Sequence, residues 1–116
     1  MDQGEAKAQY NLGYMYQDGT GVPQDYKAAV KWYRLAADQG LALAQSALGY
    51  IFNKGYGFPQ DNTMAHMWYN IGSANGNEIS GSNRDILSKK MTPAAIEKAQ
   101  AMARECINSG YVKCGY

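Results

Sequence analysis

Apolar residues recur along this chain at i, i+4, i+7 and i+8, the spacing that places them on one face of a helix. Two copies of this stripe are formed by Ala8, Leu12, Met15 and Tyr16, and by Ala44, Leu48, Ile51 and Phe52. After a short loop each is followed by a second helical stripe, formed by Tyr26, Ala29, Val30, Tyr33 and Ala37, and by Ala65, Trp68, Tyr69 and Gly72. The pattern therefore predicts two helix pairs, each a helix A followed by a helix B.

The second pair repeats the first at an offset of 36 residues, as from Ala8 to Ala44 or from Trp32 to Trp68. A unit of this length cannot bury its apolar face alone, so a period of this kind is typical of stacked repeats. We predict an all-α solenoid, a superhelix of antiparallel helix pairs. Its single domain, 1–116, would hold a first repeat at about 5–40, a second at about 41–76, a divergent capping helix pair at about 77–110 and a tail at 111–116.

Glycine, proline and aspartate mark the same positions in both copies. The loops read G-T-G-V-P-Q-D and G-Y-G-F-P-Q-D, in which glycine supplies positive φ and proline prevents helical continuation. Asp25 and Asp61 follow as N-caps. Gly13 and Gly49 stand inside helix A at a cost of roughly 1 kcal/mol each, which suggests the close approach of another helix. A phosphate-binding loop would need a preceding strand and a following Gly-Lys-Ser/Thr, so we interpret the glycine pairs as turns.

The repeat pattern weakens after Gly76. In the third helix A, Ser80, Arg84, Asp85 and Ser88 occupy the positions that have Ala44, Leu48, Gly49 and Phe52 in the second. Thr92 can then cap a last helix that has Pro93 in its first turn. A divergent last unit is what a terminal cap needs, because one of its faces meets water.

The charge of the chain is nearly balanced, with 11 Lys and Arg against 10 Asp and Glu. No global field favours nucleic acid or an anionic membrane, and no apolar run reaches the roughly 18 residues of a membrane span. We therefore predict no nucleic-acid partner and no membrane insertion. His66 has no second ligand at suitable spacing, so we expect a packed or half-exposed side chain and no metal or other cofactor. Because Asp2-Gln3-Gly4 aligns with the end of the first repeat, we expect the full protein to extend further upstream.

Three motifs at the 36-residue period, A-x-x-x-L-G-x-x-[YF], G-x-G-[VF]-P-Q-D and A-x-x-W-Y, lie between Asp2 and Gly76. With this set the chain resembles the Sel-one-like repeat (SLR) family, relatives of the tetratricopeptide repeats. The stretch R-D-x-L-S-K-K-M-T-P from Arg84 also resembles the closing segment of bacterial members. The resemblance implies a right-handed superhelix that acts as an adaptor for protein or peptide partners. The chain departs from the pattern in its weak third helix A and absent first helix B, which bear on the length of the binding groove.

Helix A carries a second face, about 180° from its apolar stripe, that should point away from helix B. In stacked helix pairs this face lines the concave side, so we predict that it binds the partner. Its residues are Tyr10, Tyr14, Gln17, Ser46, Tyr50 and Asn53. Alternatively, the tyrosine rings only fill space between neighbouring A helices. Trp32 and Trp68 have a fixed place in the repeat and are predicted to pack in the core.

Cys106 and Cys114 stand eight residues apart across Gly110, so a turn could bring the two sulfurs together. Two free thiols are one interpretation; a disulfide fits better because the tail has little else to hold it, and it would contribute about 2–3 kcal/mol. The spacing also resembles that of cysteine-rich bacterial SLR proteins. A disulfide would indicate an oxidising compartment, such as the periplasm or the cell exterior; nothing else in the sequence indicates localisation.

Three classes of function remain to be compared. The first is a non-enzymatic adaptor. The second is an enzyme, because cysteine-rich relatives are associated with penicillin binding and β-lactamase activity; yet no serine of this chain has the lysine three residues on that such chemistry uses. The third is self-association, in which the uncovered flank of the first helix A, near Tyr10 and Tyr14, would form a homodimer. We predict the adaptor and no enzyme.

Overall fold

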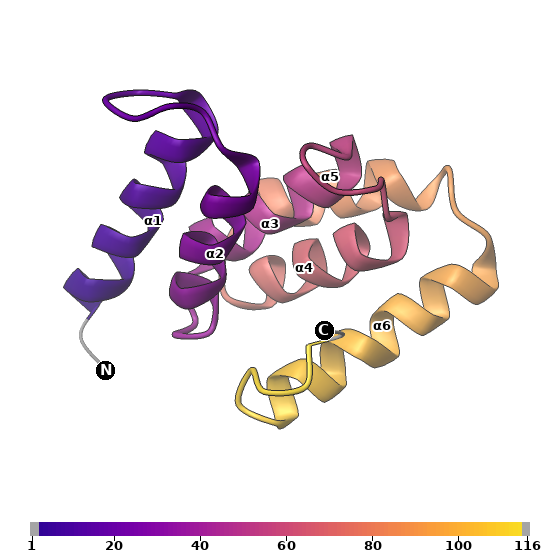
Figure 1. Cartoon of the computed structure of the whole chain (residues 1–116). Helices are drawn as coiled ribbons and strands as arrows, with labels where there is room; N and C mark the ends of the chain where they lie inside the picture. The colour runs from indigo at the N-terminus through magenta and orange to yellow at the C-terminus, as the bar shows by residue number, and fades with distance from the viewer. Residues whose placement is uncertain (1–2, 115–116) are drawn as a thin grey trace.

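The computed structural model describes residues 3–114, so Met1, Asp2, Gly115 and Tyr116 of the expected domain and tail lie outside the described residues. Within this part the chain forms α-helices only (Figure 1). These are α1 (Gln3–Asp18), α2 (Tyr26–Ala37), α3 (Ala42–Lys54), α4 (Asn62–Ala74), α5 (Glu78–Ser88) and α6 (Pro93–Asn108). The prediction of an all-α repeat fold is confirmed.

The first four helices form two pairs, α1 with α2 and α3 with α4, and the pairs stack through α2 and α3. Both expected N-caps are present: the side chains of Asp25 and Asp61 accept hydrogen bonds from the backbone N–H three residues on, at 3.1 and 3.0 Å. Gly19 and Gly55, one residue beyond α1 and α3, have φ values of +74° and +73°. The local sequence thus sets the helix ends in the same way in both repeats.

A tyrosine ring of helix B explains the glycine inside each helix A. A Cβ atom on Gly13 would lie 2.6 Å from Tyr33 Cδ1, and one on Gly49 would lie 2.5 Å from Tyr69 Cδ1. The close approach predicted from the two glycines is therefore confirmed. It locks α1 to α2 and α3 to α4 at equivalent places.

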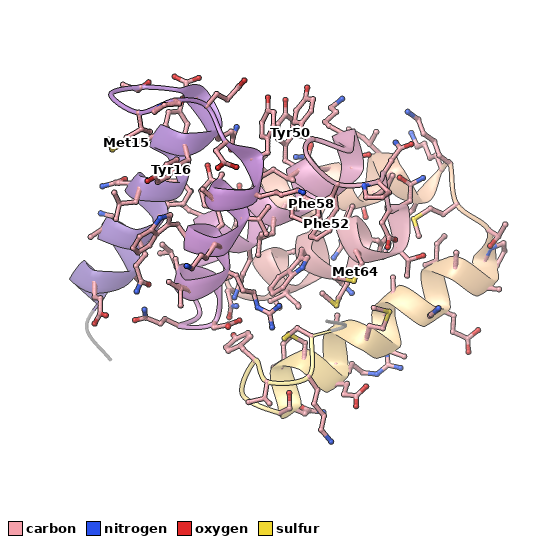
Figure 2. The ribbon with its side chains drawn as sticks, in the orientation of Figure 1. Met15, Tyr16, Tyr50, Phe52, Phe58 and Met64 are labelled. Atoms are coloured by element: carbon pink, nitrogen blue, oxygen red, sulfur yellow. A yellow bond between two sulfur atoms is a disulfide. The ribbon has the colours of Figure 1, made fainter. Side chains whose placement is uncertain are left out.

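The loop after α3 is attached to the core by an aromatic contact. The ring of Phe58 lies 5.9 Å from that of Phe52, which α3 buries (Figure 2). Phe58 takes the position that Val22 has in the first repeat. The second loop therefore packs an aromatic ring where the first packs a smaller side chain.

The last two helices differ from the predicted capping pair. Helix α5 keeps the 36-residue register, because Ser80 is buried like Ala44. However, α6 packs on α4 and scarcely touches α5, so the two helices lie on different sides of α4 (Figure 1). At the positions of Leu48 and Gly49, α5 has Arg84 and Asp85, which provide neither an apolar stripe nor the glycine that receives a helix B.

The two tryptophans are not equally buried. Trp68 is fully buried, as predicted, and the guanidinium of Arg34 lies 5.4 Å from its ring centroid. Trp32 is only half-buried. Ala8 is likewise exposed where its counterpart Ala44 is fully buried. The prediction of a core position thus applies fully to Trp68 alone.

Candidate functional site

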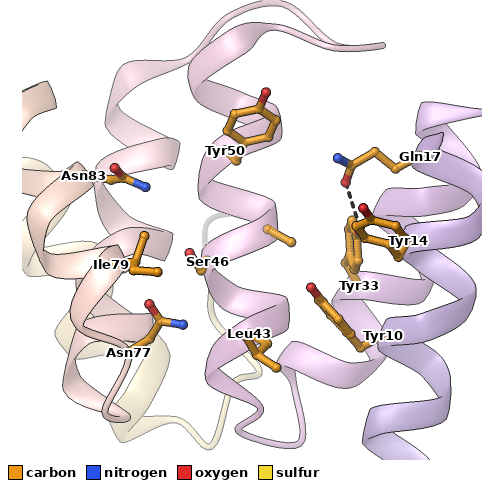
Figure 3. A pocket seen from close by; sticks show the side chains of 11 residues that line it. Tyr10, Tyr14, Gln17, Tyr33, Leu43, Ser46, Tyr50, Asn77, Ile79 and Asn83 are labelled. Atoms are coloured by element: carbon orange, nitrogen blue, oxygen red, sulfur yellow. Dashed lines mark hydrogen bonds between the residues drawn. The ribbon is translucent and has the colours of Figure 1, made fainter.

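The side chains of α1, α3 and α5 line a hollow of about 260 Å³, which we call the tyrosine hollow (Figure 3). Its lining residues are Tyr10, Tyr14, Gln17, Tyr33, Leu43, Ser46, Ala47, Tyr50, Asn77, Ile79 and Asn83. Every lining residue except Tyr33 and Asn77 belongs to a helix A or to α5, its divergent third copy. The three helices thus contribute to one continuous surface.

A second hollow, of about 420 Å³, adjoins the first, and we call it the lysine hollow. Its lining residues are Tyr50, Asn53, Lys54, Gln60, Tyr69, Asn83, Ile86 and Lys90. Because Tyr50 and Asn83 line both hollows, the two form one trough, which we call the A-helix groove.

All six residues predicted for the partner-binding face lie along this groove. Asn53 lines the lysine hollow, whereas the other five line the tyrosine hollow. The α5 residues were missed because the third repeat has lost its consensus. The 36-residue offset would have found them: Ile79, Asn83, Ile86 and Lys90 follow Leu43, Ala47, Tyr50 and Lys54 at that distance.

Two of the six residues hold the tyrosines of helix B. The Tyr33 hydroxyl donates to Gln17 Oε1 at 2.6 Å, and Asn53 hydrogen-bonds Tyr69 at the equivalent place. Burial raises the pKa of both tyrosines, so both hydroxyls stay neutral at physiological pH. Gln17 and Asn53 therefore fix the wall of the groove as well as lining it.

The tyrosines of the groove differ in how freely they face solvent. Tyr10 packs against Tyr33 with ring centroids 5.5 Å apart, and burial raises its pKa. Tyr14 and Tyr50 keep 49% and 37% of their surface exposed. Filling space between helices thus describes Tyr10 well, whereas Tyr14 and Tyr50 present ring and hydroxyl to solvent.

Tyr50 is held in place by the loop that follows its helix. Its ring and that of Tyr56 pack edge-to-face with centroids 5.8 Å apart, and Tyr56 stacks on Tyr26 with centroids 5.0 Å apart. A hydrogen bond with Tyr56, together with desolvation, raises the pKa of Tyr50. Thr20 takes the place of Tyr56 in the first repeat, so Tyr14 lacks this support. Tyr50 is therefore the more rigid of the two exposed rings.

His66 is buried and lies outside the groove. Ser88 Oγ donates to the Arg84 carbonyl, so it accepts from His66 Nε2 at 2.9 Å, and Nδ1 is left without a partner. Burial, with a smaller effect of Arg84, lowers the pKa of His66, although Asp85 opposes this.

No group of three or more His, Cys, Asp or Glu that could hold a metal is found in residues 3–114. Nor is any helix in this part long and apolar enough to cross a membrane.

The Cys106–Cys114 disulfide is formed, which confirms the predicted bridge. It closes a loop that carries Tyr111, whose hydroxyl accepts a hydrogen bond from Asn75 Nδ2 at 3.1 Å. Asn75 Nδ2 also donates to Gln45 Oε1 at 2.8 Å. The bridge thus keeps the tail docked on the end of α4.

The Sel1 repeat model matches residues 6–41 and 42–77, the two repeats described above. The chain belongs to the Sel1 repeat family. Repeats of this family generally mediate protein interactions and are typically non-catalytic. The resemblance drawn from the sequence motifs is therefore confirmed.

Two solved structures support this assignment. The crystal structure of c5321, a protective antigen present in uropathogenic Escherichia coli strains that displays an SLR fold, is similar with a TM-score of 0.87 and 35% identity. That match covers 94% of this chain and 24% of c5321. A Sel1 repeat protein from Oxalobacter formigenes is similar with a TM-score of 0.61 and 42% identity, over 64% of this chain and 56% of that one. The chain thus spans about a quarter and about half of their lengths. No curated protein matches it in sequence.

Proposed function

We propose that this Sel1 repeat chain is an adaptor that binds an extended segment of a partner protein in the A-helix groove. The observation that supports it is the row of exposed rings: Tyr14 and Tyr50 occupy the same repeat position and line one hollow. Tyrosine offers a large contact area at low entropic cost, together with a hydroxyl. Leu43 and Ile79, 44% and 69% exposed, add apolar surface beside them.

The dimensions of the groove fit a short peptide. Leu43 and Lys54 are 11 residues apart on α3, a rise of roughly 16 Å at about 1.5 Å per residue. An extended chain advances about 3.3 Å per residue, so about five residues of a partner would lie along α3. A contact of this size suits a weak, reversible adaptor.

The test is selection from a random peptide display library with the immobilised chain. We expect peptides that bind the wild-type chain and lose at least tenfold in affinity to the double variant Tyr14→Ala, Tyr50→Ala. The matched control is Leu35→Ala, Ile107→Ala, which removes apolar side chains of similar exposure (42% and 39%) outside the groove. Circular dichroism checks that both variants are folded. Selected peptides that bind the tyrosine variant as tightly as the wild type would exclude the groove.

Self-association through α1 has weaker support. Ala8 is exposed, whereas its counterpart Ala44 on α3 is buried. However, α1 also exposes the polar residues Glu5, Lys7 and Asn11. A surface of this composition offers little apolar area to a second copy. We expect a mass in light scattering that stays monomeric as concentration rises.

A further inference from the structure

Charge is distributed unevenly along the A-helix groove. No Asp, Glu, Lys or Arg lines the tyrosine hollow. The lysine hollow contains Lys54 and Lys90, and no carboxylate lines it. The groove therefore changes from neutral, with apolar side chains, to basic within the length of one helix.

The two lysines have no ion-pair partner in residues 3–114. The ion pairs in this part of the chain are Arg34–Asp38 and Arg84–Asp85, and both lysine side chains are exposed. Lys54 ends α3, and Lys90 lies two residues beyond α5, so each meets the negative end of a helix dipole, about half a charge. The two lysine charges exceed the two half-charges of the helix ends, which leaves a net charge of about +1.

Position along the repeat places this charge between α3 and α5. Lys54 and Lys90 are one period apart, and the residue one period before Lys54 is Asp18. The first repeat thus has a carboxylate where the second and third have ammonium groups. An acidic group would be attracted between α3 and α5 and repelled at the corresponding place on α1.

Asn83 lies where the two hollows meet. Its side-chain amide lines both hollows beside Tyr50. A side-chain amide can accept from a backbone N–H and donate to a backbone C=O at once. Asn83 can therefore hold the main chain of a bound peptide irrespective of its sequence.

We infer that the groove selects a protein segment that is acidic at one end and aliphatic at the other. Asp or Glu side chains lie between Lys54 and Lys90, aliphatic side chains contact Leu43 and Ile79, and the backbone between them is held by Asn83. This inference rests on the proposed function and specifies its partner. Charge complementarity sets the direction of the segment, because the reversed peptide would place its acids in the neutral hollow.

The experiment compares peptides selected from the random display library, synthesised with acetylated and amidated ends so that only side chains carry charge. We expect selected peptides to be enriched in Asp and Glu at one end. Their affinity falls about tenfold in the double variant Lys54→Glu, Lys90→Glu, and it also falls as NaCl rises from 50 to 300 mM. The control Lys27→Glu, Lys31→Glu makes the same charge change on exposed positions of α2, outside the groove, and leaves affinity unchanged. Asp18→Lys, which extends the basic row onto α1, increases the affinity of longer acidic peptides.

The outcomes separate this inference from the proposed function. Peptides that need Tyr14 and Tyr50 but carry no acidic bias, or bind the Lys54→Glu, Lys90→Glu variant equally well, would overturn the acidic specificity and leave the adaptor. Failure to select any groove-dependent peptide would overturn both. Acidic peptides that lose affinity equally to the α2 control would show a general charge effect and also refute the inference.

Discussion

Replacing Gly49 by alanine tests the helix contact on which the groove depends. In an exposed helix this change stabilises by about 1 kcal/mol. Here the new Cβ would lie 2.5 Å from Tyr69 Cδ1, against at least 3.4 Å in an ordinary contact, so the ring would have to move by 3.4 − 2.5 = 0.9 Å. Tyr69 is 1% exposed and hydrogen-bonded to Asn53, so it has little room. Overpacking of this kind costs about 1–3 kcal/mol, and at so rigid a site we expect a net loss of about 1–2 kcal/mol.

The assay is urea unfolding, followed by circular dichroism at 222 nm. In a thermal melt followed by the same signal, the midpoint should fall by about 4 °C for each kcal/mol lost. The control is Gly81→Ala on α5, where the nearest atom to the new Cβ is the rotatable Ser73 hydroxyl, at 2.9 Å, and the next lies at an ordinary contact distance of 3.6 Å. Tyr69→Leu should remove the cost of Gly49→Ala, which a double-mutant cycle measures. Gly49→Ala with wild-type stability or better would refute the close-contact reasoning.

Three further predictions concern parts of the chain outside the groove. Reduction of Cys106–Cys114 should lower the free energy of unfolding by about 2.5 kcal/mol, measured by urea unfolding with and without reductant; an unchanged midpoint would contradict this. Because its folded pKa lies below the ordinary 6.5, His66 takes up a proton more readily when unfolded, so stability present above pH 6.5 falls as pH falls below it. His66→Val should lessen the loss between about pH 7 and 5 in thermal melts. Asn75→Ala leaves the buried Gln45 oxygen unpaired and should cost about 1–3 kcal/mol in urea unfolding, whereas Asn75→Gln should cost less.

Much of this fold could be predicted from the sequence because the 36-residue period places residues of the same kind at equivalent packing positions in both repeats. Gly13 and Gly49 alone indicated that helix B approaches helix A closely, although they did not identify the tyrosine rings that make the contact. Asp25 and Asp61 indicated where helices start. These features are local, or repeat at a fixed offset, so one sequence contains enough information to find them.

The third repeat was harder to predict because its packing depends on long-range contacts. The helices α5 and α6 were expected, but the attachment of α6 to α4 was not. Arg84 and Asp85 stand in α5 where α3 has Leu48 and Gly49, so α5 lacks the face that would receive a helix B. The tail contact between Tyr111 and Asn75 crosses 36 residues and left no local signal. The groove was predicted on α1 and α3 and missed on α5 for the same reason.

The comparison of the repeats separates the positions that build the scaffold from those that could recognise a partner. Identical residues occur where contact geometry leaves one choice, at Gly13 and Gly49 beneath Tyr33 and Tyr69. Several positions in or beside the groove differ between copies, because a side chain that faces solvent can change without moving a helix, whereas Tyr14 and Tyr50 are the same. Examples of differing pairs are Tyr10 and Ser46, Asp18 and Lys54, and Thr20 and Tyr56. A solenoid can therefore change its ligand one repeat at a time, and the change from Asp18 to Lys54 is the step that would place an acidic segment between α3 and α5.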